Sequence, residues 1–328
     1  MIRLLVLLAF CVPLAQALST TSSSSPSLRV ALPGLSAERF RHRTDRDLTE
    51  LVQRLPGQQL LVEQGLRRAL PLIEQGVRLD LLATAVRVSP DQFPDLYDLL
   101  REACQVLDLV SNDDDDDAVL PDLYVQSNPQ ANAYTLAWQS PNQSPIIVVT
   151  SALLEQCTGP EIQAVLGHEL GHVKCEHALY LTAGGVAATP LRQLPVVGAS
   201  IDDQLQQWRL AAEYTCDRAA LLVAQDVQVV ASALLKLFAG TGRSSQYSQV
   251  NVQAFLDQCA QYETQMEQAN PWVRRALQQQ LKQRTHPLPI RRVAALQSWA
   301  ESDDYARILL KGTPMIVNDD NEAKSSDE

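Results

Sequence analysis

The sequence predicts a mainly helical α+β fold in which a small antiparallel sheet packs beside one central helix. Three observations lead to this class. A capped, apolar helix is expected at Thr158–His177, and three short strand-like segments precede it between residues 123 and 150. Segments with apolar residues at helical spacing then fill most of the chain from Ser200 to Ala300. A run of strands followed by a run of helices is the pattern of the α+β class.

Length and composition describe a globular, acidic chain. The 328 residues suffice for one large or two modest domains with a buried core, and 46% of them are hydrophobic while 20% are charged. The net charge is −11 and the pI is about 5.0. Because a nucleic-acid binder needs a basic patch to neutralise phosphates, this balance argues against nucleic acid as a partner.

Cysteine usage indicates free thiols. The six cysteines form no C-x-x-C pair, so a cysteine zinc site is not expected. One of them lies in a predicted targeting segment, which leaves five. An odd set without a spacing pattern favours a reducing compartment over an extracellular disulfide scaffold. The six are Cys11, Cys104, Cys157, Cys175, Cys216 and Cys259.

The N-terminus carries two targeting features. Met1–Ala17 has the positive start, apolar centre and small-residue end of a signal peptide. Residues 18–36 are rich in Ser and Thr and contain Arg29 but no acid, as in a transit peptide. Together they resemble bipartite targeting to a plastid. The alternative is an ordinary secretory signal followed by a linker, for which the sequon at Asn142 is weak support.

Residues 37–110 are expected to form a helical N-terminal region. Two or three helices are predicted over Arg39–Leu82, then a short strand at Thr84–Val88 and a helix from Ser89 to about Leu109. Five consecutive aspartates follow at positions 113–117. An EF-hand would need alternating ligands, a glycine and a terminal glutamate, so we interpret this run as a solvated loop.

Three strand-like segments stand directly before the central helix, at Leu123–Ser127, Asn132–Trp138 and Ile146–Thr150. Turn residues separate them, which predicts a small antiparallel sheet. The edge of such a sheet exposes unpaired N–H and C=O groups, to which an extended peptide can add as another strand. The simpler alternative is that the sheet serves only as scaffold.

The central helix carries the chemistry. It has the marks of a capping box, with Thr158 at its start and Glu161 three residues later. His168 and His172 are four residues apart and therefore lie on one face of the helix, with Glu169 beside them. This H-E-x-x-H pattern predicts a zinc site in which two imidazoles bind the metal and the carboxylate acts on the zinc-bound water. Isolated helical histidines are more often packed or surface residues, but the full pattern inside a capped apolar helix favours the metal site.

The segment after this helix, Ala178–Pro190, is apolar and contains Gly184-Gly185. It is shorter than the roughly 20 residues that a membrane-spanning helix needs. We interpret it as a loop, a lid or a surface-associated hairpin, and peripheral contact with a membrane stays open.

The remaining chain is predicted to be helical up to an acidic tail. Helices are expected at Ser200–Ala224, Val227–Ala239, within the Gln-rich stretch Tyr247–Arg284, and at Ile290–Ala300. The polar segment Asn318–Glu328 is predicted to be disordered. We place the catalytic domain at 118–312 and the tail at 313–328.

A catalytic zinc binds three protein ligands and keeps a fourth position open. One helix face supplies only His168 and His172, so the third ligand must come from elsewhere in the chain. Glu213, on a predicted helix, is the best candidate, and Asp217 one turn later can accept the other ring N–H of a ligand histidine. The alternative for this Glu-x-x-x-Asp pair is two solvated carboxylates, although a nearby cation would explain two like charges on one face.

Four motifs in this order resemble metallopeptidase family 48, the gluzincin peptidases that include the HtpX and CaaX prenyl protease types. The motifs are His168-Glu169-Leu170-Gly171-His172, Glu213 with Asp217, Asn132-Ala133-Tyr134, and Thr285-His286-Pro287 with Arg292. They span about Asp122–Trp299, and the surrounding sequence is similar to soluble plastid-type members. The resemblance implies a zincin-like catalytic domain with the sheet packed beside the H-E-x-x-H helix.

The resemblance also implies roles for the matching residues. One Zn²⁺ per chain would be bound by His168, His172 and Glu213. Glu169 would act as general base, taking a proton from the zinc-bound water and passing it to the leaving amine. His286 would help to bind the oxyanion, the alternative being a turn residue before proline.

Other residues would support this centre. Asp217 would orient a ligand histidine, and Arg292 would anchor the C-terminal segment to an acid such as Asp217. Asn132-Ala133-Tyr134 would bind the substrate strand. His177 matches a histidine often found after the motif, but it lies off the ligand face and is interpreted as structural.

The chain departs from HtpX and the prenyl proteases because it lacks their long transmembrane helices. We therefore expect a soluble or peripheral zinc metalloendopeptidase that acts on peptides or unfolded proteins in extended conformation. One alternative is a catalytically inactive zinc-binding relative that serves as a scaffold or interaction module. Another is a secreted protease of the same chemistry. The oligomeric state and the cleavage preference do not follow from the sequence.

Overall fold

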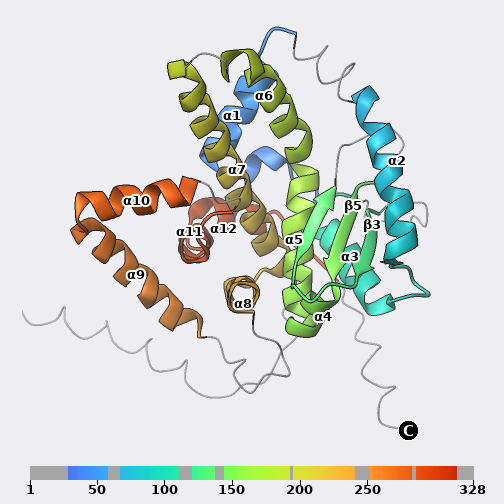
Figure 1. Ribbon diagram of the computed structural model, residues 1–328. Helices are drawn as coiled ribbons and strands as arrows, with labels where there is room; N and C mark the ends of the chain where they lie inside the picture. Colours follow the sequence, from blue (N-terminus) through green and yellow to red (C-terminus); the bar gives the residue numbers. More distant parts are fainter. Residues whose placement is uncertain are drawn as a thin grey trace, which may run out of the picture. The chain divides into compact units, whose positions relative to one another are not determined.

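The computed structural model describes residues 29–57, 67–110, 120–136, 144–192, 195–240, 251–282 and 286–315. Val30–Thr313 forms one unit (Figure 1). A second unit comprises Met1–Arg29 and Pro314–Glu328, of which residues 29, 314 and 315 are described. The predicted signal peptide, residues 18–28 of the transit-like segment, the aspartate run, Trp138, Thr285 and residues 316–328 of the acidic tail lie outside the described residues.

Helix α5 (Gly159–Lys174) is the element around which the candidate site is built. It begins with the predicted capping box, in which the backbone N–H of Thr158 donates to the Glu161 carboxylate at 2.7 Å. The same carboxylate accepts a hydrogen bond from Lys236 Nζ at 2.7 Å, which ties the start of α5 to helix α8 (Val227–Ala239). The helix start is therefore held by local capping and by a tertiary ion pair.

Beside α5 lies a four-stranded sheet in the order β2 (Val86–Arg87), β3 (Asp122–Gln126), β5 (Ile146–Thr150) and β4 (Ala133–Leu136). The sheet is mixed rather than purely antiparallel, because β3 and β5 run parallel while β4 pairs antiparallel with β5. Strand β5 inserts between the two strands that precede it in the chain, and all of its residues are buried. Strand β4 is left at the sheet edge, where it contacts α5.

Helix α7 (Pro195–Ala224) packs closely along α5, on the side away from the sheet (Figure 1). Two glycines of α5 permit this approach. A Cβ at Gly167 would lie 2.8 Å from Val223 Cβ, and one at Gly171 would lie 2.8 Å from Ala219 Cβ. Real Cβ atoms do not come this close. The glycines therefore let α7 approach until its side chains reach the histidine-bearing face of α5.

The N-terminal part supplies β1 (Val30–Ala31), the 3-10 helix Ala37–Arg39, α1 (Arg43–Gln53), α2 (Arg67–Thr84) and, after β2, α3 (Pro94–Val106). Helix α1 packs against α6 and α7, and α3 packs against α5. Helix α3 begins later than the predicted start at Ser89, because Phe93 adopts a φ of 60° and so interrupts helical geometry.

The residues after α5 form helix α6 (His177–Arg192), so the prediction of a loop, lid or hairpin was wrong. Leu179 and Ala183 are fully buried against Trp208 of α7. A Cβ at Gly184 would lie 2.6 Å from Trp208 Cζ3, so this glycine serves close packing and does not form a turn. No helix among the described residues has the length and hydropathy needed to cross a membrane.

The remaining elements are α4 (Ser151–Gln156), α9 (Val252–Gln268), α10 (Pro271–Lys282), α11 (Pro289–Ala300), α12 (Asp303–Leu309) and β6 (Thr313–Pro314), which pairs with β1. Helix α8 has the predicted bounds and ends at Gly240 with a φ of 68°. Helix α11 packs against α7 and α8, so the C-terminal part of the chain lies beside the helix that carries Glu213. The five cysteines that the structure describes are free, as predicted, and the mainly helical α+β class is confirmed.

Candidate metal centre

Two histidines of α5 and one glutamate of α7 face one another. His168 and His172 stand one helical turn apart, with ring centroids 5.3 Å apart. The Glu213 carboxylate lies 3.5 Å from Nε2 of His168 and 3.6 Å from Nε2 of His172. The sequence-based candidates for the three metal ligands therefore converge between the two helices.

The other ring nitrogen of His168 is bound to a carboxylate. Its Nδ1 lies 3.1 Å from Asp217 Oδ1, one turn after Glu213 on α7. Arg292 of α11 donates to the same carboxylate through Nε at 2.8 Å and Nη2 at 2.6 Å. This bidentate pair leaves Asp217 as an acceptor for the Nδ1–H of His168, which directs the Nε2 lone pair toward Glu213.

The other ring nitrogen of His172 has a different partner. Its Nδ1 lies 3.0 Å from Nδ1 of His177, the first residue of α6. Nε2 of His177 lies 3.1 Å from Asp45 Oδ2, on α1. The sequence analysis assigned His177 a structural role and did not single out Asp45. No sequence pattern indicated this contact, since 132 positions separate the two residues.

The arrangement fits a zinc ion. Both Nδ1 atoms are engaged by neighbouring groups, so both Nε2 atoms are available on the side where the Glu213 carboxylate lies. Two imidazole nitrogens and one carboxylate are a donor set that suits catalytic Zn²⁺ and leaves a fourth position open.

Cys216 lies close to the same histidines. Its Sγ, like ring nitrogens of His168 and His172, belongs to one group of possible ligand atoms within 4.8 Å of one another. The thiol is fully buried, and burial raises its pKa well above the usual value, whereas the Glu213 carboxylate faces Nε2 of both histidines. Its nearest polar contact is Nδ1 of His177 at 3.5 Å. Glu213 is therefore the better candidate for the third ligand.

Charge at the centre is concentrated on Glu213. Burial favours the neutral carboxyl, but hydrogen bonds with His168 and His286 hold the pKa of Glu213 well below its usual value. Burial lowers the pKa of His172 to about 3. For His168, burial is outweighed by Asp217 and Glu213, which raise its pKa to about 9. A cation bound here would meet an ionised carboxylate and would displace the proton from His168.

Glu169 lies beside the histidines in a buried position. Thr135 Oγ1, on the edge strand β4, donates to Glu169 Oε2 at 2.7 Å and contacts the Glu169 backbone oxygen at 3.2 Å. Burial raises the pKa of Glu169 above its usual value. A carboxylate with a raised pKa is a stronger base, which suits proton transfer near neutral pH. Sequence analysis did not identify Thr135, because its contact with Glu169 depends on how β4 packs against α5.

A cavity of about 630 Å³ opens onto this centre. One side is formed by Asn132 and Ala133 at the start of β4 and another by apolar residues of α8, including Val230, Leu234 and Phe238. Tyr134, the third residue of the predicted substrate-binding motif, does not line the cavity. Its side chain packs among Leu81, Tyr124, Ile146 and Val148.

His286 lies at the mouth of the cavity. Its side chain is 61% exposed, and its Nδ1 lies 2.7 Å from Glu213 Oε2. The side chain thus reaches the candidate ligand from the α11 side while remaining accessible to solvent. Arg292, in the same part of the chain, is directed at Asp217 as described above.

The sequence profile of peptidase family M48 matches residues 104–300. The chain belongs to this family. It is 40% identical over 280 residues to the plastoglobule-localized metallopeptidase 48, chloroplastic, of Arabidopsis thaliana, a match that covers 84% of this chain and 76% of that protein. It is 32% identical over 105 residues to the protease HtpX homolog of Moorella thermoacetica, covering 32% of this chain and 31% of that protein. No solved structure matches the chain.

Membership of the M48 family confirms the resemblance found in the sequence and makes peptide-bond hydrolysis the expected class of activity. Part of this M48 centre lies outside the matched residues. Asp45 of α1 precedes residue 104, yet it contacts His177 beside the candidate ligands.

Proposed function

We propose that the protein is a zinc-dependent metalloendopeptidase in which His168, His172 and Glu213 bind one Zn²⁺. The observation that carries this proposal is the convergence of two Nε2 atoms on the Glu213 carboxylate, beside Glu169 and an open cavity. When bound, zinc supplies Lewis-acid polarisation of a carbonyl group and makes water a better nucleophile near neutral pH.

Glu169 moves the proton in this proposal. Its Oε2 accepts from Thr135 Oγ1, so the other carboxylate oxygen is free to take a proton from the attacking water. The same carboxyl then returns the proton to the nitrogen of the leaving amine, which would otherwise be a poor leaving group. His286, exposed and close to Glu213, would donate to the substrate carbonyl oxygen as negative charge develops on it.

The substrate is an extended peptide. Strand β4 lies at the sheet edge, where an added strand would pair with the backbone groups on its outer side, whereas the N–H and C=O of Asn132 already bond Thr150. The facing wall of the cavity is apolar and comes from α8. We infer a preference for substrates with an apolar side chain next to the cleaved bond. Because the bond must be in an extended segment, unfolded proteins are the expected substrates.

The test compares wild-type protein with Glu169→Gln and with the control Glu155→Gln, an exposed residue of α4. Wild type and control should each bind about one zinc per chain and cleave casein. Glu169→Gln should keep the zinc and lose roughly 10²–10⁴-fold in cleavage rate, because only the proton transfer is removed.

The alternative is an inactive zinc-binding relative that acts as a scaffold. A wild-type protein that holds one zinc per chain, cleaves no unfolded substrate and is indistinguishable from Glu169→Gln would establish that alternative. An intact Glu169 favours the enzyme, because a purely structural zinc site needs no base beside its ligands.

We also propose localisation to a plastid. The support is the signal-like segment 1–17 followed by the transit-like segment 18–36, and the similarity to a protein described as chloroplastic. A fluorescent fusion of residues 1–36 should accumulate in the plastid. Secretion of the fusion would establish the alternative of a secreted protease. We also propose that the mature chain consists of a helical region at 37–110, a peptidase domain at 118–312 and an acidic tail.

A further inference from the structure

We propose that Asp45 of α1 positions the metal ligand His172 through His177, so that the N-terminal helical region is part of the metal centre. The inference rests on the proposed function, since it concerns the histidine that binds zinc there. The contacts that carry it are the 3.0 Å approach of Nδ1 of His172 to Nδ1 of His177 and the 3.1 Å approach of Nε2 of His177 to Asp45 Oδ2.

The proton positions along this chain have one consistent solution. A histidine that binds metal through Nε2 carries its proton on Nδ1, so His172 must donate to His177. Nδ1 of His177 must then be an acceptor, which places the single ring proton of His177 on Nε2. That proton needs an acceptor, and Asp45 provides it. The carboxylate thus selects the tautomer of His177 and, through it, the tautomer of His172 that binds metal.

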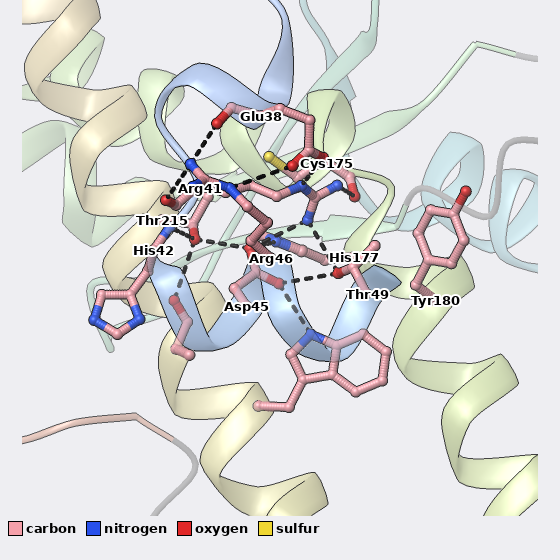
Figure 2. Close-up of polar contacts among 12 residues, drawn as sticks. Glu38, Arg41, His42, Asp45, Arg46, Thr49, Cys175, His177, Tyr180 and Thr215 are labelled. Carbon is pink, nitrogen blue, oxygen red and sulfur yellow. Dashed lines mark hydrogen bonds and ion pairs between the residues drawn. The ribbon is translucent and has the colours of Figure 1, made fainter. Parts of the chain in front are cut away.

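Asp45 is held as a permanent acceptor. It is completely buried, and its two oxygens accept from Trp208 Nε1 at 2.9 Å, Thr215 Oγ1 at 2.8 Å and Arg41 Nη1 at 3.1 Å (Figure 2). Burial opposes its ionisation, but the hydrogen bond from His177 and the charge of Arg41 hold its pKa well below the usual range. Every donor around it therefore favours the carboxylate form.

The same cluster fixes α1 to the end of the metal-binding helix. Arg41 Nη2 donates to the backbone oxygen of Cys175, the C-cap of α5, at 2.7 Å (Figure 2). Thr215 of α7 donates to Asp45 and accepts from the backbone N–H of His42 at 3.0 Å. The carboxylate is therefore held relative to both α5 and α7, the two helices that carry the ligands.

A role in folding alone does not account for this geometry. A buried carboxylate paired with a buried arginine adds little stability over apolar residues of the same size. The cluster instead ends in a histidine whose second nitrogen is directed at a ligand ring. Cys216 Sγ also approaches Nδ1 of His177, but at 3.5 Å it is the more distant of the two neighbours, so His172 is the principal donor.

The experiment measures zinc affinity by chelator competition on folded, purified full-length protein, with circular dichroism to verify folding. The variants are Asp45→Asn and His177→Phe, and the matched control is Asp47→Asn, whose side chain on the same helix is 63% exposed. Both test variants should bind zinc roughly 10–100-fold more weakly than wild type, as for loss of an outer hydrogen-bonding partner of a ligand, while Asp47→Asn should be unchanged. His177→Gln, which retains a donor for Asp45 and an acceptor for His172, should recover part of the loss.

A second readout separates positioning from general stability. In zinc-loaded wild type, ¹H–¹⁵N spectra of the imidazole rings should show His172 protonated at Nδ1 and His177 protonated at Nε2. Wild-type zinc affinity in a folded Asp45→Asn or His177→Phe variant overturns the inference while leaving the proposed function intact. If Asp45→Asn does not fold, the zinc affinities of His177→Phe and His177→Gln test the inference instead. If wild type binds no zinc, the proposed function fails and the inference falls with it.

Discussion

The two candidate ligand histidines stand on the same helix face but are oriented by different parts of the molecule. Nδ1 of His168 contacts Asp217 directly, and Asp217 follows Glu213 by one turn on α7. Nδ1 of His172 contacts a second histidine, which in turn contacts Asp45 on α1. Both chains of contacts end in a buried carboxylate paired with an arginine, the half-buried Arg292 or the buried Arg41.

In both cases a carboxylate orients a histidine. For His168 that carboxylate lies one turn from Glu213 in the same helix, whereas for His172 it lies on a helix far away in the sequence. On the Asp217 side, one helix supplies both the third ligand and the orienting carboxylate, so a single approach of α7 to α5 places both. On the Asp45 side, α1, α5, α6 and α7 must all be in position before the contacts form. The Asp45 side therefore makes the N-terminal region a requirement of the centre.

The largest effect on zinc affinity is expected at Glu213, which faces both histidines. Glu213→Gln removes the anionic group that faces both Nε2 atoms, and zinc affinity should fall by more than the roughly 10–100-fold typical of an outer partner. Chelator competition measures the change, with Glu155→Gln as the exposed control. A Glu213→Gln protein that kept wild-type affinity would transfer the third-ligand role to another residue, with Cys216 the first to test.

The two carboxylates should differ in their contribution to stability. Asp217→Asn removes the bidentate partner of Arg292, whose next carboxylate contact, to Glu213, is 4.0 Å long. Asp45→Asn leaves Arg41 with Glu38 and the Cys175 carbonyl. We expect losses of about 3–5 kcal/mol for Asp217→Asn and toward the lower end for Asp45→Asn, because an unpaired buried charge is costly. Urea unfolding of the metal-free variants measures both, and equal losses would contradict the ranking.

The contribution of Asp45 to the free energy of unfolding should decrease as the pH is lowered. The folded-state pKa of Asp45 lies below the ordinary aspartate value of 3.8, so its contribution to stability is present above that value. The contribution is lost as pH falls through the folded-state pKa. In metal-free protein, the difference in unfolding free energy between wild type and Asp45→Asn should therefore shrink as pH is lowered below about 4. The Asp47→Asn difference should stay near zero, and a constant Asp45→Asn difference down to pH 2 would argue against an ionised buried carboxylate.

The smallest effect on metal binding is expected at Cys216, which lies between the two sides. Its thiol is buried and contacts Nδ1 of His177, so Cys216→Ser should change zinc affinity by less than about twofold. The substitution should still cost about 1–3 kcal/mol of stability if the new hydroxyl finds no partner. Chelator competition and urea unfolding separate these effects, and a tenfold loss of affinity would identify the thiol as a ligand.

Much of the fold followed from local sequence pattern. The capping box of α5 and the bounds of α8 depend on groups a few residues apart, so their signals lie within one segment. The same holds for His168 and His172, because helix geometry alone places them on one face. Glu213 could be proposed because the chemistry of zinc required a third ligand and few carboxylates stood in a suitable helix.

Other features were misread or not visible for a common reason. Ala178–Pro190 was interpreted as a loop, a lid or a surface-associated hairpin, but its glycine at 184 makes room for Trp208 and the segment is helical. The consecutive strands predicted an antiparallel sheet, but β5 lies between β3 and β4 and runs parallel to β3. In each case the deciding contact lies between residues far apart in the chain.

By itself, the sequence predicted the helix of the candidate metal centre, with its two histidines and Glu169, and the class of chemistry they support, because those relations depend on the 3.6-residue period and on ligand preference. Only the tertiary structure decided which groups orient those histidines. The contacts of Thr135 with Glu169, and of Asp45 with His177, depend on strand register and on the packing of four helices. Hydrogen bonds of this kind need side-chain atoms within about 3 Å of each other, a precision that local pattern does not encode and that close packing of the core supplies.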